Sequence, residues 1–129
     1  MPIAERIASL AEVAECSDNA EHFSLSFRDF LDGFYPDPSD EKLRDEPADL
    51  RAILNDDGYA NAYLAATAEY LARCYKLTVP RWSMNPARIV DRPRFAMKTH
   101  AGRMFLLLES PPEFRARNIF ISADALTRV

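Results

Sequence analysis

Few side chains in this sequence are suited to nucleophilic or metal chemistry. The sequence holds two cysteines, Cys16 and Cys74, and two histidines, His22 and His100. A serine or cysteine nucleophile needs a supporting histidine and carboxylate, and no motif of that kind surrounds these residues. Zinc needs three or four cysteine and histidine ligands at loop or helix spacing, which this set does not offer. We therefore expect no catalytic residue, no metal site and no cofactor.

Glycine and acidic motifs lead to the same expectation. Three glycines, Gly33, Gly58 and Gly102, lie far apart, whereas a phosphate-binding loop needs several close together. The acidic run at residues 37–41 begins like a calcium loop, but Lys42 stands where the tight turn of such a loop needs glycine. The sequence therefore favours a binding protein over an enzyme.

Charge is distributed unevenly along the chain, although the net charge of its 129 residues is only −4. The acidic half, residues 1–72, holds 5 Lys+Arg against 16 Asp+Glu, and the basic half, residues 73–129, holds 11 against 4. Such a division indicates either a basic surface for an anionic partner or two parts of one domain that attract each other. No linker separates the halves, which favours the second interpretation.

The sequence predicts helices over most of the chain. Apolar residues recur at three- and four-residue spacing over residues 2–14, which predicts an amphipathic helix. A second helix is predicted over residues 23–34, where a phenylalanine stripe follows capping residues at positions 17–19. Residues 59–77 contain neither glycine nor proline and are rich in alanine, so we expect them to form the central helix.

Shorter elements are predicted in the basic half. Trp82 lies in a connection, where an indole commonly finds one hydrogen-bond acceptor. Residues 97–109 predict a helix with interior leucines, and the Ser-Pro-Pro-Glu sequence of residues 110–113 has the spacing of a capping box. On the helix that follows, we expect Phe114 in the core and the neighbouring arginines pointing away from it. Residues 119–121 predict a very short strand or a buried extended segment.

Together these elements predict an all-α fold, a single compact helical domain over residues 1–129 with about five to seven helices. A membrane span is not expected, because the longest apolar run, residues 104–108, is far shorter than the roughly 20 residues that a bilayer requires. The charged N-terminus is unlike a signal peptide. We expect a cytoplasmic protein whose two cysteines are reduced and packed.

A more specific pattern lies in residues 68–129. It comprises "AEYLARCYKLTVPRW", "NPARIVDRPRF" and "LLLESPPEFRARNIFISADALTRV", of which the ending, ESPxxFRxRNIFxSxxALxRV, is the most specific part. In these residues the chain resembles a family of small, uncharacterised bacterial helical proteins. Members of that family look like genomic neighbours of nucleotidyltransferase-fold proteins, in pairs that suggest toxin and antitoxin modules. The resemblance implies a protein partner of that fold and carries over no catalytic residue.

A basic segment beside an apolar triplet near the C-terminus is the predicted binding surface. We expect a non-enzymatic protein–protein interaction module, antitoxin-like or accessory in a bacterial two-protein system, with a homodimer as an open alternative. Binding of nucleic acid by the basic half is the second hypothesis, although the sequence pI of 5.2 does not favour it. For Phe120 the alternative is a purely structural role in the core. The predicted partner-binding residues are Trp82, Arg115, Arg117, Asn118, Phe120 and Arg128.

Overall fold

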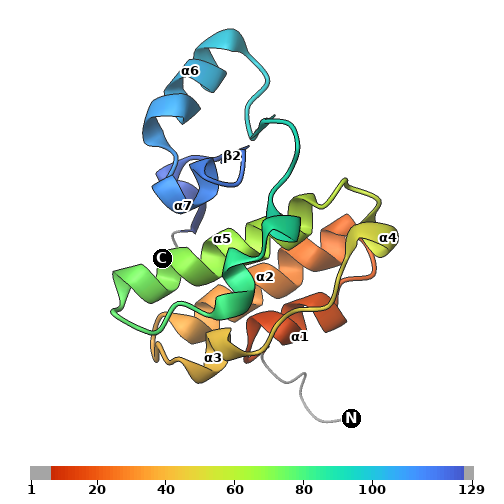
Figure 1. Cartoon of the computed structure of the whole chain (residues 1–129), viewed down its shortest axis with the longest axis vertical. Coiled ribbons are helices and arrows are strands. Elements are labelled where there is room, and N and C mark those ends of the chain that lie inside the picture. Colours follow the sequence, from red (N-terminus) through yellow and green to blue (C-terminus); the bar gives the residue numbers. More distant parts are fainter. Residues whose placement is uncertain (1–6, 127–129) are drawn as a thin grey trace.

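The computed structural model describes residues 7–126, which form a mainly helical bundle (Figure 1). The helices within these residues are α1 (Leu10–Glu15), α2 (Ala20–Phe34), α3 (Glu41–Arg44), α4 (Arg51–Leu54), α5 (Tyr59–Cys74), α6 (His100–Glu109) and α7 (Pro112–Arg115). Short 3-10 turns and strands complete the described chain: η1 (Arg81–Met84), η2 (Pro86–Arg88), η3 (Ala123–Leu126), β1 (Arg94–Phe95) and β2 (Ile119–Phe120). The predicted all-α fold is confirmed.

The first helix begins later than predicted. Ser9 is the N-cap of α1, and its hydroxyl accepts a hydrogen bond from the Glu12 amide at 3.2 Å. The Glu12 carboxylate accepts a hydrogen bond from the Ala8 amide at 3.1 Å, so both side chains satisfy free amides at the helix start. Residues 7–9 are not helical, and residues 2–6 of the predicted helix lie outside the described residues.

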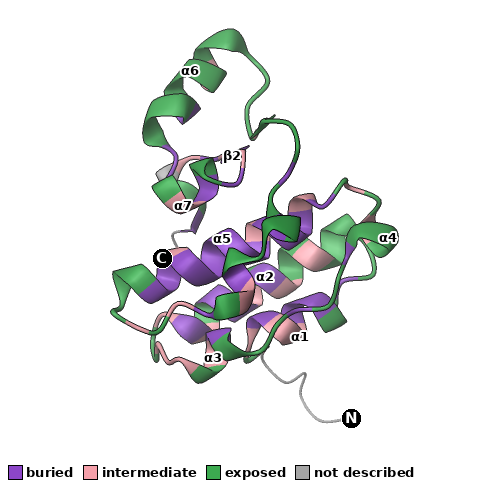
Figure 2. Cartoon of the chain, viewed as in Figure 1, coloured by how far each residue is buried: buried purple, intermediate pink, exposed green. Residues whose placement is uncertain are grey.

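The two longest helices build the core. The side chain of Asn19 caps α2 by accepting a hydrogen bond from the His22 amide at 2.8 Å. Most of the phenylalanine stripe of α2 is buried as predicted, with Phe30 and Phe34 completely inaccessible to solvent, whereas Phe23 is partly buried. The predicted central helix is α5, which is buried over most of its length (Figure 2). Its small alanine side chains let neighbouring elements pack closely against it.

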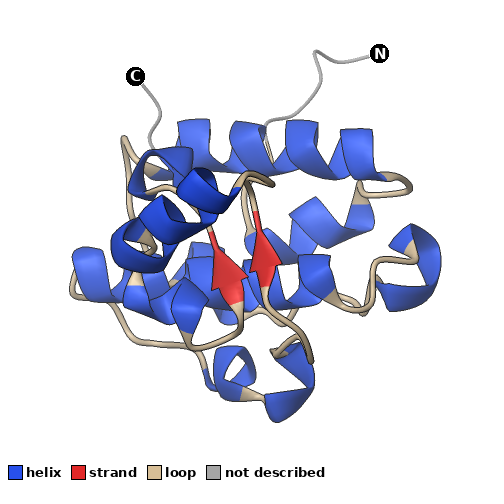
Figure 3. Cartoon of the chain, turned by 90° about the horizontal axis from the view of Figure 1, so that it is seen from above, coloured by secondary structure: helices blue, strands red, loops and turns tan. Residues whose placement is uncertain are grey.

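A short parallel strand pair organises the C-terminal part of the described chain. β1 and β2 lie side by side and run in the same direction (Figure 3), with Phe95 opposite Phe120. The backbone hydrogen bond from the Ala96 amide to the Phe120 carbonyl measures 3.0 Å. The extended segment predicted at residues 119–121 is confirmed, whereas its partner β1 was not predicted.

Helix α6 projects from this strand pair and stands away from α2 and α5 (Figure 1). It was predicted over residues 97–109 and ends at Glu109 as expected. Of its ten residues only Leu106 is buried. The prediction of interior leucines is therefore wrong for Leu107 and Leu108, which are 40% and 81% exposed.

The predicted capping box at residues 110–113 is also absent. Pro111, not Ser110, is the N-cap of α7. The Ser110 hydroxyl instead donates a hydrogen bond to the Ile121 carbonyl at 2.7 Å in the interior. This bond ties the end of α6 to the chain just after β2, which explains why the hydroxyl does not cap α7.

Both cysteines differ from the packed state that we expected. Cys16 and Cys74 are exposed, and no disulfide joins them.

In residues 7–126, none of the helices combines the length and the apolar character that crossing a bilayer would require.

Candidate docking surface

The six predicted partner-binding residues do not form one exposed surface. Arg115 is exposed, Trp82, Asn118 and Phe120 are half-buried, and Arg117 is only 4% exposed. Arg128 lies outside the described residues. The docking prediction assumes accessible side chains, and of the five described residues Arg115 alone is fully accessible.

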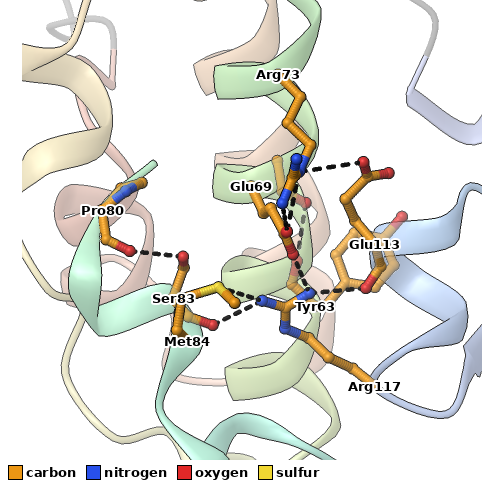
Figure 4. Close-up of polar contacts among 9 residues, drawn as sticks. Tyr63, Glu69, Arg73, Pro80, Ser83, Met84, Glu113 and Arg117 are labelled. Atoms are coloured by element: carbon orange, nitrogen blue, oxygen red, sulfur yellow. Dashed lines mark hydrogen bonds and ion pairs between the residues drawn. The ribbon is translucent and has the colours of Figure 1, made fainter. Parts of the chain in front are cut away.

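Arg117 lies at the meeting point of α5, α7 and η1 (Figure 4). Its Nη1 donates to Glu69 Oε1 at 2.9 Å and to the Glu113 carbonyl at 2.7 Å. Its Nη2 donates to the Ser83 carbonyl at 2.7 Å. The expectation that Arg117 points away from the core is therefore wrong, because its guanidinium joins three elements inside the protein.

Glu69 is the anionic centre of this cluster. It is 7% exposed, and its Oε2 accepts a hydrogen bond from Arg73 Nη2 at 2.6 Å. Burial by itself would raise the pKa of Glu69, but hydrogen bonds from Arg73 and Arg117 outweigh this effect and lower the pKa. Glu69 is consequently ionised at neutral pH and neutralises the buried Arg117.

Arg88 provides a second link between the acidic and basic halves. Its buried guanidinium donates to the Pro47 carbonyl at 2.7 Å and to Glu46 Oε2 at 3.2 Å. Arg88 and Arg117 both belong to the basic half, and their carboxylate partners belong to the acidic half. Some of the opposite charges of the two halves therefore attract each other within the fold.

Trp82 and Asn118 also hold segments of the chain together. The indole Nε1 of Trp82 donates to the Leu43 carbonyl at 3.0 Å, which confirms the single predicted acceptor. The side-chain amide of Asn118 donates to the Val90 carbonyl at 2.8 Å. Both side chains therefore have structural partners in this conformation.

Phe120 is half-buried and packs on another aromatic side chain that also contacts α6. Its ring stacks on Phe95 with 4.6 Å between the centroids. The guanidinium of Arg103, on α6, lies 5.5 Å from the centroid of the Phe95 ring. Phe120, Phe95 and Arg103 thus connect the strand pair to the helix.

The largest group of exposed apolar side chains on one helix lies on α6. Leu108 is 81% exposed, Met104 50%, Phe105 47% and Leu107 40%. At about 100° per residue, these four positions span an arc of about 160° on the side opposite the buried Leu106. We call Met104, Phe105, Leu107 and Leu108 the docking face.

The N-terminal end of α6 is fixed by a close turn. Thr99 is the N-cap, and its hydroxyl accepts a hydrogen bond from the Gly102 amide at 3.0 Å. A Cβ atom at Gly102 would lie 2.8 Å from the Cβ of Met97, closer than ordinary van der Waals contact. Glycine is therefore required for this approach, and the turn fixes the start of α6.

The segment that carries the docking face is basic, although the exposed Glu109 at the end of α6 directly follows it. Residues 92–108 contain four Lys+Arg and no Asp or Glu, and Arg115 is exposed on α7. The basic residues within this segment are Arg92, Arg94, Lys98 and Arg103. A binding partner that complements this side of α6 would present an apolar surface bordered by carboxylates.

The leucines of α6 were predicted to lie in the core, although one feature of the sequence indicates an exposed apolar side. Residues 104–108 are five consecutive apolar residues within a helix. Such a run places apolar side chains all round the helix, and a single neighbouring element covers only one side of it. The uncovered side is a candidate interface.

Possible metal ligands are not grouped together in the described chain. Among residues 7–126, no three His, Cys, Asp or Glu side chains lie together in a way that could hold a metal ion. His22 forms a hydrogen bond with Asp18 at the exposed start of α2.

Comparison of the chain with protein-family models, with curated proteins and with solved structures gave no match. Its function is therefore inferred from its own residues.

Proposed function

We propose that this protein is a non-enzymatic interaction module whose helix α6 docks into an apolar, acid-bordered groove on a different protein. The observation that carries the proposal is the docking face, four large apolar side chains on the solvent side of a projecting helix. Leaving such a surface in water is unfavourable, and burying it favours association.

The docking face is large enough to contribute substantially to affinity. Full burial of a leucine or phenylalanine side chain is worth about 1.5–3 kcal/mol. Since Leu108 is 81% and Phe105 47% exposed, burying what remains of the two would supply about 2–4 kcal/mol, a quarter to a half of the roughly 8 kcal/mol that stabilises a micromolar complex. Leu108 is the most exposed of the four and is the expected hot spot.

Charge favours a different protein over a second copy of this chain. An amphipathic helix commonly binds by placing its apolar side in a groove, with charges at the rim selecting the partner. A second copy would bring two segments with four cationic residues each into contact. An acidic partner would instead be attracted, which increases the rate of association.

The resemblance of residues 68–129 supports a more specific assignment, since α6 lies inside that range. We assign the protein to a bacterial two-protein system as its antitoxin-like or accessory member, with a nucleotidyltransferase-fold protein as its partner. The exposed and unbridged Cys16 and Cys74 support a cytoplasmic setting, where thiols stay reduced.

Nucleic-acid binding is the second candidate function. It is favoured by the four cations and absent carboxylates of residues 92–108. The docking face argues for a protein partner, because contacts to phosphates do not bury leucine side chains. Salt dependence separates the two candidates, since binding to nucleic acid weakens steeply as salt rises.

The experiment is capture from the native host by three tagged forms of the protein, at low and at high salt. They are the wild type, the double variant Leu107→Asp with Leu108→Asp, and the control Leu25→Asp. Leu25 lies on α2, is 50% exposed and tests the general effect of a surface aspartate.

We expect the wild type and the control to retain one acidic protein in equimolar amount at both salt concentrations. The double variant should retain at least about tenfold less. Equal retention by all three forms would contradict docking through α6. Retention of nucleic acid alone, lost at high salt, would favour the second candidate.

A further inference from the structure

A groove of about 500 Å³ opens between α2, the start of α5 and Arg94 of β1. None of the docking-face residues lines it. Its volume lies within the roughly 300–1,000 Å³ that is typical of small-molecule sites. The groove is mainly apolar, and its polar side chains include two arginines, Arg28 and Arg94.

Four aromatic rings form the apolar wall of the groove. Tyr63 is at their centre: its ring packs edge-on against Phe27 at 5.2 Å and against Phe23 at 6.4 Å between centroids. The ring of Tyr59 lies 5.7 Å from that of Tyr63. Phe23, Tyr59 and Tyr63 are only partly buried although they pack against the core. The rings thus offer a fixed aromatic surface that remains accessible from the groove.

The hydroxyl groups of Tyr59 and Tyr63 are available to a ligand. Neither has a hydrogen-bond partner among residues 7–126, although both side chains line the groove. No buried polar side-chain atom in the described residues lacks a partner, so both hydroxyls retain access to solvent. Burial raises the pKa of both tyrosines, which keeps the hydroxyls protonated and able to donate at neutral pH.

Charge at the groove favours an anion. The Arg94 guanidinium lies 4.8 Å from the centroid of the Tyr59 ring, and Arg28 is exposed on α2. Asp56 is the one carboxylate among the described residues of the lining, and it accepts hydrogen bonds from the amides of Gly58 at 3.1 Å and Ala60 at 3.0 Å. The Asp56 charge is therefore engaged at the start of α5. Arg94 Nη1 donates to the Asp56 backbone carbonyl at 3.3 Å, which leaves other N–H groups of Arg94 for a ligand, and Arg28 lines the same groove.

We propose that this groove binds a small planar aromatic carboxylate. Its ring packs against the wall formed by Phe23 and Tyr59, because aromatic rings favour edge-to-face and offset contacts. Its carboxylate accepts charge-assisted hydrogen bonds from Arg28 and Arg94, whose planar donors match a carboxylate. This site is independent of docking through α6.

The test uses 2-naphthoate as the probe and its neutral analogue 2-naphthamide as the matched ligand. Binding to the full chain is followed by protein amide shifts in NMR titrations. Arg28→Gln removes one guanidinium from the groove, and Arg44→Gln removes an exposed arginine of α3 that does not line it. Arg28 is exposed, so its replacement is not expected to unfold the protein.

We expect saturable binding of 2-naphthoate, with shifts at residues of the groove and an affinity about tenfold higher than that of 2-naphthamide. Arg28→Gln should weaken 2-naphthoate about fivefold and leave 2-naphthamide unchanged, while Arg44→Gln should change neither. The proposal is overturned if 2-naphthoate produces no saturable shifts, if acid and amide bind equally, or if both variants weaken the acid to the same extent.

Discussion

Helices α5 and α6 are both rich in apolar residues, yet their surroundings are opposite. Eleven of the 16 residues of α5 are buried, against one of the ten residues of α6. Other parts of the chain cover α5 on several sides, whereas α6 contacts the rest mainly through the strand pair at its base. The comparison teaches that apolar content predicts a need for burial, and that for α6 this need is not met within residues 7–126.

The largest effect on stability is expected at the charged cluster beside α5. Arg117→Met removes a buried partner of Glu69 and should lower the free energy of unfolding by about 3–5 kcal/mol. Arg115→Met, two residues away and exposed, should change it by no more than about 0.5 kcal/mol. Urea denaturation of both variants measures the contrast. Similar losses in the two variants would show that Arg117 is not the interior link described above.

Within α6, neighbouring leucines should behave differently. Leu106→Ala leaves a cavity at the base of the helix and should cost about 2–4 kcal/mol of unfolding free energy. Leu108→Ala removes a side chain that is 81% exposed and should cost less than about 0.5 kcal/mol. Thermal and urea denaturation measure both. A large loss for Leu108→Ala would mean that its side chain packs within the monomer.

Acid should weaken the cluster around α5. The pKa of Glu69 is lowered in the folded protein from its ordinary value of 4.5. The stability that Glu69 contributes is therefore present above about pH 4.5 and is lost as the pH falls through the lower folded pKa. Glu69→Gln should flatten this part of the acid decline, as measured by urea denaturation at several pH values. An unchanged pH profile in the variant would contradict the ionised pair.

A small effect on stability is expected from the charges beside the docking face. Lys98→Glu with Arg103→Glu should leave the free energy of unfolding within about 1 kcal/mol of the wild type, because both side chains are exposed and the lost contact of Arg103 with the Phe95 ring is worth about 0.5–1 kcal/mol. The same change should slow association with an acidic partner about tenfold at low salt and affect dissociation little. Stopped-flow or surface-binding kinetics separate the two rates. Faster association of the variant would indicate a basic partner.

Local features of this fold could be predicted from the sequence. Asn19 caps α2, Trp82 finds one acceptor, and the apolar stripe of residues 23–34 faces the core. Each depends on a spacing of a few residues or on one preference of a side chain. Such patterns determine where a helix starts and which side it buries.

Contacts between distant residues could not be predicted in the same way. Arg117 is buried because Glu69, 48 residues earlier in the chain, meets it across α5 and α7. The strand β1 exists only because residues 119–120 pair with it. Helix α6 was predicted, but the exposure of its leucines depends on how the rest of the chain packs around the helix. The pattern of apolar residues within the helix does not contain that information.

Oxidative footprinting of methionines, in host cells and on the purified protein, tests docking through α6 most directly. Met104 belongs to the docking face and is 50% exposed, whereas Met84 on η1 is 57% exposed and serves as the internal control. We predict that Met104 is oxidised several-fold more slowly in cells than in the purified protein, while Met84 is oxidised at the same relative rate in both. Equal oxidation of Met104 in the two settings would contradict an α6 that is covered by a partner.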